Sequence, residues 1–109
     1  NTHWAYGADN AERYRKIEKD ADCPGSMITI DLVKPLAEFY DNCRIRKGPS
    51  FGMEITLMSP FMYMAHYDLV SEETGRDDLK GYGINPDLVR ISVGTEPIEE
   101  IIAAFDEAL

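Results

Sequence analysis

The sequence has little cysteine and no excess of positive charge. Two cysteines, Cys23 and Cys43, occur in 109 residues, too few for a secreted disulfide scaffold and in a spacing that matches no zinc motif. We therefore expect free thiols and a cytoplasmic protein. Acidic residues number 20 against 11 basic ones, which gives a formal net charge of −9. Because nucleic acids and anionic membranes both require a basic surface, this charge argues against either as a partner.

The chain also lacks a hydrophobic run long enough to span a membrane, and its first residues do not have the pattern of a signal peptide. It contains no P-loop, no nucleophile elbow and no recognisable catalytic triad. Two histidines, His3 and His66, are too few for a metal site, and no carboxylate spacing adds to them. The residues alone therefore predict no metal site and no catalytic group.

Hydrophobic residues make up 44% of the chain, enough for one compact domain with a core. Apolar residues at helical spacing predict three helices. The first covers residues 9–21 and begins with Asp9 as its cap; the second follows Pro35 and buries a stripe from Leu36 to Cys43. The third follows Pro97, with Thr95 or Glu96 as its cap. Its predicted core stripe is Ile98, Ile101, Ile102, Phe105 and Leu109.

Alternating apolar residues and turn signals predict strands over residues 26–32, 44–46, 55–58 and 88–93. Residues 59–69 fit neither period, and the charged residues 71–80 are typical of a surface loop or a short helix. Strands of this length, with helices that each have one apolar face, predict an α/β (α+β) domain. In this fold class a small sheet is covered on one side by helices.

Arg90 is the most unusual residue, because it lies in the middle of an apolar strand between Val89 and Ile91. A buried cation without a partner costs much free energy. One interpretation is a structural salt bridge to a carboxylate such as Asp31 on a neighbouring strand. The other is a binding site for a carboxylate or phosphate, which a guanidinium can hold with two parallel hydrogen bonds. From the residues alone, the salt bridge is favoured.

Two further segments are weaker candidates. The turn Ser50-Phe51-Gly52 can present backbone N–H groups and a hydroxyl to an anion. His66 lies in an aromatic, methionine-rich segment, where a packing role is favoured over a catalytic one. By themselves, these residues indicate an α/β domain with one candidate anion site.

The end of the chain carries a more specific signal. Residues 83–102 include Leu88-Val89-Arg90-Ile91-Ser92-Val93-Gly94 and resemble the C-terminal signature of the Cys/Met-metabolism family of pyridoxal-phosphate enzymes. Its members include cystathionine gamma-synthase, cystathionine lyases, methionine gamma-lyase and O-acetylhomoserine sulfhydrylase. Residues 25–30 and 37–46 match more loosely, and Ser50-Phe51-Gly52 is similar to the family's serine-leucine-glycine motif. The sequence departs from the family at Ser59-Pro60 (histidine-proline) and Ala65-His66 (threonine-histidine).

The resemblance implies that residues 1–109 form a single domain, the C-terminal small domain of a longer fold-type I enzyme. In the family, the arginine that matches Arg90 binds the substrate α-carboxylate, and the serine that matches Ser50 lies by the cofactor lysine and the substrate. Pyridoxal phosphate would be bound mainly by the preceding domain, which supplies the Schiff-base lysine. The 109-residue chain would then hold no catalytic or cofactor-binding residue and would be inactive alone.

The partners implied are the chain's own N-terminal pyridoxal-phosphate domain, further copies in a homo-oligomer (a tetramer for the full-length protein) and an amino-acid substrate. The implied reaction is a transsulfuration-type γ-replacement or elimination on a homoserine-derived or cystathionine-like amino acid. The resemblance does not separate synthase, lyase and sulfhydrylase. The alternative is a stand-alone α/β binding or protein-interaction module, without catalytic activity, in which Arg90 is only ion-paired.

Overall fold

The computed structural model describes residues 8–20 and 25–109, with the side chains of residues 8–10 left out. Its centre is a four-stranded sheet in the order β1-β4-β3-β2. The strands are β1 (Met27–Ile30), β2 (Arg46–Lys47), β3 (Leu57–Pro60) and β4 (Val89–Ser92). β4 is antiparallel to both of its neighbours, and β2 is parallel to β3. The strand that carries Arg90 therefore lies inside the sheet, between the first and the third strand of the chain.

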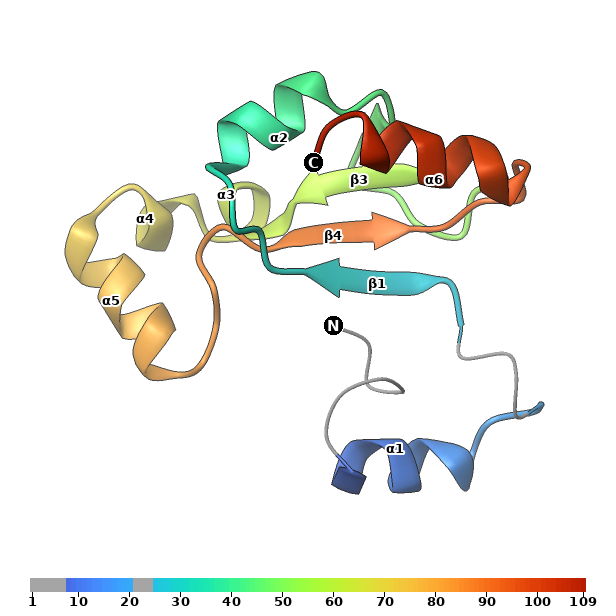
Figure 1. Cartoon of the computed structure of the whole chain (residues 1–109). Coiled ribbons are helices and arrows are strands. Elements are labelled where there is room, and N and C mark those ends of the chain that lie inside the picture. The colour runs from blue at the N-terminus through green and yellow to red at the C-terminus, as the bar shows by residue number, and fades with distance from the viewer. Residues whose placement is uncertain (1–7, 21–24) are drawn as a thin grey trace.

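Two helices, α2 (Leu36–Asn42) and α6 (Ile98–Asp106), lie side by side on one face of the sheet (Figure 1). Between them and the strands is the main core. It contains Phe39, Cys43, Ile45, Met58, Val89, Ile91, Ile101, Ala104 and Ala108. The predicted fold class, a small sheet covered on one side by helices, is confirmed. Cys43 is a buried free thiol, as expected, whereas Cys23 lies outside the described residues.

Three short helices between β3 and β4 form a lobe at one end of the sheet (Figure 1). They are α3 (Phe61–Ala65), α4 (Tyr67–Val70) and α5 (Glu73–Gly81). A second small core of Met62, Val70 and Leu79 holds the lobe together. Gly75 allows α5 to pack closely, because an added Cβ there would collide with the backbone of Leu69. The sequence predicted no element for residues 59–69 and left residues 71–80 as a loop or a short helix.

Several predicted boundaries are wrong. Helix α1 (Ala8–Arg15) ends well before residue 21, and Ile17, predicted to be in its apolar stripe, is 80% exposed. The side chain of Asp9, its predicted cap, is not described. β2 begins only at the last residue of the strand predicted at 44–46, and β3 lies two residues further along the chain than the strand predicted at 55–58.

The core stripe of α6 is also different from the prediction. Its buried residues are Ile101 and Ala104, followed by Ala108 just past its end, whereas Ile98 and Ile102 are more than half exposed. Ile101, Ala104 and Ala108 belong to the main core, so tertiary packing decides which face of the helix is buried. The N-cap is Pro97, with no side-chain cap, so neither of the predicted capping residues has that role.

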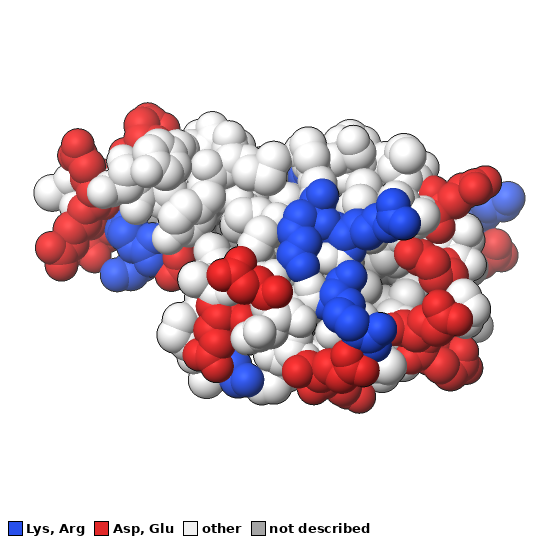
Figure 2. Space-filling view, turned by 90° about the horizontal axis from the view of Figure 1, so that it is seen from above, with Lys and Arg blue, Asp and Glu red and all other residues white. Residues whose placement is uncertain are grey.

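Acidic side chains dominate the helix-covered side. Figure 2 shows them at both ends of this face, with a smaller group of basic side chains between them. In residues 8–20 and 25–109, no helix has the length and apolar character needed to cross a membrane. The same residues contain no group of three or more His, Cys, Asp or Glu side chains able to hold a metal ion.

A candidate anion site around Arg90

Arg90 lies on the sheet face opposite to α2 and α6. Its neighbours in β4, Val89 and Ile91, are buried in the main core, so the alternation of the strand directs Arg90 to the other face. Thr29 in β1 and Ser59 in β3 are its cross-strand partners. The guanidinium is thus carried by a central strand with a hydrogen-bonded partner on each side.

The predicted salt bridge does not form: none of the ion pairs among the described residues includes Arg90. Instead, its guanidinium donates a hydrogen bond to the backbone carbonyl of Pro49. Its Cζ atom lies 4.8 Å from the ring centre of Phe61 and 5.6 Å from that of Phe51, within the range of cation–π attraction. Since an arginine has more N–H donors than this one bond uses, Arg90 can still bind an anion.

The loop after β2 brings Ser50 and Phe51 to this site. Ser50 is exposed and follows Pro49, whose carbonyl accepts the hydrogen bond from Arg90. The loop is held in turn by the end of β4, because the N–H of Gly52 donates to the Ser92 hydroxyl at 3.1 Å. The structure therefore places both sequence-predicted site residues, Arg90 and Ser50, in one neighbourhood.

A second set of hydrogen bonds holds the far end of the same loop. Thr56 donates its N–H and its hydroxyl to the carboxylate of Glu96, and the N–H of Thr95 donates to the carbonyl of Glu54 at 2.8 Å. The backbone hydrogen bond from Thr56 is the largest cause of a lowered pKa at Glu96. Glu96, predicted to be a helix cap, instead holds the loop against the turn between β4 and α6.

An apolar cavity of about 420 Å³ adjoins Arg90, between the sheet and the lobe of α3, α4 and α5. It is lined by Thr29, Phe61, Met62, His66, Leu69, Leu79, Ile84, Leu88 and Arg90. His66 is exposed at its edge and lies in an edge-on contact with Phe61, with 6.4 Å between ring centres. Sequence reasoning missed Phe61 and the cavity, because short helices give residues 59–69 no readable period. Their aromatic and methionine content was the only available signal.

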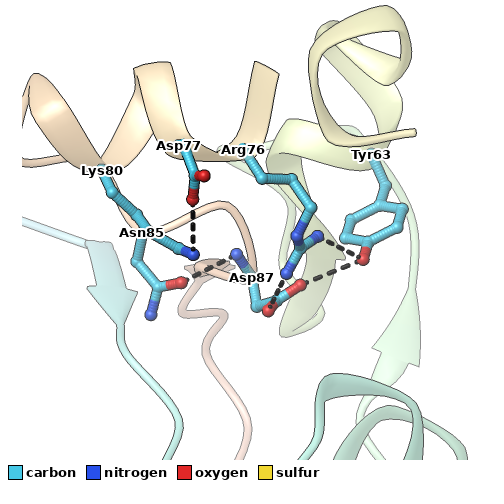
Figure 3. Close-up of polar contacts among 6 residues, drawn as sticks. All are labelled: Tyr63, Arg76, Asp77, Lys80, Asn85 and Asp87. Carbon is cyan, nitrogen blue, oxygen red and sulfur yellow. Dashed lines mark hydrogen bonds and ion pairs between the residues drawn. The ribbon is translucent and has the colours of Figure 1, made fainter. Parts of the chain in front are cut away.

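A polar network fixes the lobe beside this cavity (Figure 3). Arg76 in α5 forms an ion pair with Asp87 at 2.5 Å and donates to the hydroxyl of Tyr63 in α3 at 3.0 Å. The Tyr63 hydroxyl also donates to Asp87, which precedes β4. The hydrogen bond with Asp87 is the largest cause of a raised pKa at Arg76. Two helices of the lobe are therefore tied to the segment that leads into the Arg90 strand.

The fold and the site define a small α/β domain in which an arginine of a central strand adjoins an apolar cavity. The sequence model of the family described as Cys/Met metabolism PLP-dependent enzyme matches residues 4–109. The chain therefore belongs to the PLP-dependent enzymes of cysteine and methionine metabolism, as the resemblance in residues 83–102 indicated.

Individual relatives agree with this family. Over 96% of its length, the chain is 44% identical to an L-2-amino-4-chloropent-4-enoate dechlorinase/desaturase of Streptantibioticus cattleyicolor, and it covers 21% of that protein. Over 93% of its length, it is 35% identical to a cystathionine gamma-synthase of Neurospora crassa, of which it covers 16%. The chain thus spans about a fifth or less of the length of these curated relatives.

A solved structure confirms the fold. The crystal structure of a cystathione gamma lyase from Micromonospora echinospora superposes on 81% of this chain with a TM-score of 0.66, at 24% sequence identity. The chain corresponds to 22% of that structure. The mixed sheet and its helices are therefore an architecture found in a larger protein.

The side chains described around Arg90 include no group for a covalent bond to the cofactor of this family. None of the described residues that line the Arg90 cavity is a lysine. Lys34 contacts the carbonyl of Ala108, Lys47 contacts the carbonyl of Cys43, and Lys80 forms an ion pair with Asp77. Within the described part of the chain, the side chains around Arg90 therefore offer a guanidinium but no amine for a covalent bond to pyridoxal phosphate.

Proposed function

We propose that this chain is the C-terminal substrate-binding domain of a PLP-dependent transsulfuration-type enzyme, in which Arg90 binds the α-carboxylate of the amino-acid substrate. The single observation that carries this proposal is the guanidinium itself. It lies on a central strand without an ion-pair partner among the described residues. One backbone carbonyl and two aromatic rings hold it in place. A preorganised guanidinium is well suited to a carboxylate.

Ser50 completes the proposed binding site from the loop that touches Arg90. Its hydroxyl is exposed and can donate to the substrate or to the cofactor side of the site. In this proposal the pyridoxal phosphate and its lysine belong to the preceding part of the full-length chain. The 109 residues alone would then be inactive. The complete enzyme would be a cytoplasmic homo-oligomer, a tetramer in the full-length protein.

The proposed chemistry takes place at the γ-carbon of a homoserine-derived or cystathionine-like amino acid. Two relatives support this proposal by their names, since one is a cystathionine gamma-synthase and the other acts on an amino acid with chlorine on carbon 4, the γ-carbon. Bound pyridoxal phosphate supplies the electron sink for such reactions. The contribution of this domain is to orient the substrate, and orientation lowers a barrier by several kcal/mol.

The test is the replacement of Arg90 in the full-length enzyme. A hydrogen bond to a charged group contributes about 1.5–3 kcal/mol, so Arg90→Ala is expected to lower kcat/KM for the amino acid about ten- to a hundredfold. Arg90→Lys keeps the charge but not the paired donors, and it is expected to restore only part of the loss. Arg44→Ala is the matched control, because Arg44 is exposed and ion-paired with Glu107 outside the cavity. An unchanged kcat/KM in Arg90→Ala would refute the carboxylate role.

A further inference from the structure

We propose that Ser92 is a positioning residue, which places the Ser50 hydroxyl by holding the loop between β2 and β3. The proposal rests on the function proposed above, in which the Ser50 hydroxyl donates to the substrate or to the cofactor side of the site. Its basis is a hydrogen bond that joins two parts of the chain 40 residues apart: the backbone N–H of Gly52 donates to the Ser92 hydroxyl at 3.1 Å. Because Ser92 is only 2% exposed, we expect it to act through the loop and not by contact with a ligand.

Two residues of β4 hold this loop. Arg90 and Ser92 occupy alternate positions of the strand, so their side chains lie on the same face of the sheet. Arg90 donates to the backbone carbonyl of Pro49, and Ser92 accepts the N–H of Gly52. Ser50 lies in the short span between these two contacts. Among the described residues, no hydrogen bond involves the Ser50 side chain itself, so its direction follows from the backbone that β4 holds.

The rest of the loop is held without Ser92. Before the span, the N–H of Gly48 donates to the carbonyl of Met58 in β3 at 3.0 Å. After the span, the carbonyl of Glu54 accepts the N–H of Thr95 at 2.8 Å. Loss of the Ser92 hydroxyl is therefore expected to leave the loop attached at both ends, while the span between them gains conformational freedom. Substrate binding is then affected more than folding.

The first experiment replaces Ser92 in the full-length enzyme and separates the effect of its hydroxyl from that of its volume. Ser92→Ala removes one hydrogen bond and is expected to lower kcat/KM for the amino-acid substrate about two- to tenfold. Ser92→Cys keeps the volume but offers only a weak acceptor, so it should share this loss, whereas Ser92→Thr keeps the hydroxyl and should restore kcat/KM. A packing role predicts the reverse order, because threonine adds a methyl group at a buried position. Wild-type kcat/KM in Ser92→Cys would overturn the proposal, whether or not Ser92→Thr folds.

A double-mutant cycle with Ser50→Ala tests the route through the loop. If Ser92 acts by placing the Ser50 hydroxyl, Ser92→Ala should have little further effect on kcat/KM once that hydroxyl is absent. The same fold loss in both backgrounds would overturn the proposal. Arg90→Ala tests the proposed function separately. If Arg90→Ala lowers kcat/KM while Ser92→Ala does not, the carboxylate site stands and only the role of Ser92 is refuted.

A matched pair of glycines tests the loop side of the contact. Gly52 and Gly83 have similar left-handed backbone angles, with φ of 69° and 74°, and an added Cβ meets nothing within 4 Å at either position. Gly52→Ala and Gly83→Ala are therefore expected to lower the free energy of unfolding by similar amounts. Only Gly52→Ala should also lower kcat/KM, because Gly52 carries the N–H that reaches Ser92. An equal effect of the two variants on kcat/KM would overturn the proposal.

Discussion

The carboxylate of Glu96 accepts two hydrogen bonds from Thr56, one from its backbone N–H at 2.6 Å and one from its hydroxyl at 2.8 Å. The same hydroxyl accepts the N–H of Gly94 at 2.9 Å. These contacts join the start of β3 to the turn that follows β4. The loop between β2 and β3 carries Pro49 and Phe51, the two residues through which it touches Arg90. The position of the guanidinium therefore depends on a carboxylate outside the site.

The Glu96 contact predicts acid sensitivity. Its pKa is below the ordinary glutamate value of 4.5 because the carboxylate accepts hydrogen bonds, above all from the backbone of Thr56. The stabilisation is fully present above that ordinary value and is lost as the pH falls through the lower, folded-state pKa. Urea unfolding of the wild type and of Glu96→Gln from pH 7 to pH 3 should give free energies of unfolding that converge at low pH. Asp106→Asn, at an exposed position of α6, is the control. A difference between wild type and Glu96→Gln that does not vary with pH would contradict this role.

Gly94 is predicted to tolerate no side chain. A Cβ at this position would lie 2.5 Å from the carbonyl oxygen of Glu54 and would also collide with the Glu96 carboxylate. Gly94→Ala is therefore expected to lower the free energy of unfolding by about 1–3 kcal/mol, as overpacking does, and to raise KM in the full-length enzyme. Gly81→Ala is the control, because an added Cβ there meets nothing within 4 Å. Equal stability of the two variants would show that the turn can relax around a methyl group.

The network of Tyr63, Arg76 and Asp87 is predicted to stabilise the lobe cooperatively. The Arg76 and Asp87 side chains are only 27% and 33% exposed, so water screens their ion pair less than a surface pair. Asp87→Ala is expected to lower the free energy of unfolding by about 1.5–3 kcal/mol, because it removes two hydrogen bonds that involve charged groups. A double-mutant cycle with Tyr63→Phe measures the coupling, and additive losses would argue against a network. Asp77→Ala, in an exposed pair with Lys80, serves as the control.

The main core and the strand of Arg90 could be predicted from the sequence because their apolar residues repeat with a clear period. The apolar stripe after Pro35 predicted α2, in which Phe39 is fully buried. The alternation of apolar residues around Arg90 predicted both β4 and the sheet face from which the guanidinium projects. In both elements, local pattern and tertiary packing favour the same arrangement.

Other features depend on contacts between distant residues. α3 and α4 are five and four residues long, too short for a helical period, so the lobe and its cavity could not be predicted. In α6, Ala104 is buried in the main core while Ile102 is half exposed, so tertiary packing overrides the preference of the larger side chain for the core. Arg90 contacts Pro49 and Phe61, which are distant from it in the sequence. The sequence pattern around Arg90 therefore could not predict whether its guanidinium contacts a carboxylate or aromatic rings.

Phe61 is predicted to position Arg90 for the substrate. Cation–π contacts contribute about 0.5–2 kcal/mol, so loss of the ring corresponds to about two- to thirtyfold weaker binding of the carboxylate. Phe61→Leu keeps most of the apolar volume but removes the ring, and in the full-length enzyme it is expected to raise KM within that range with a smaller effect on kcat. Phe61→Tyr should retain the wild-type KM, because it keeps an aromatic face.

A double-mutant cycle separates positioning from simple packing. In an Arg90→Ala background, Phe61→Leu should have little further effect on KM, because the ring acts through the guanidinium. Tyr67→Leu provides the control, since Tyr67 is 65% exposed on α4 and does not line the cavity. If Phe61→Leu raised KM equally with and without Arg90, its ring would contribute only to the cavity wall. In that case the aromatic contacts would not account for the position of Arg90, which forms no ion pair among the described residues.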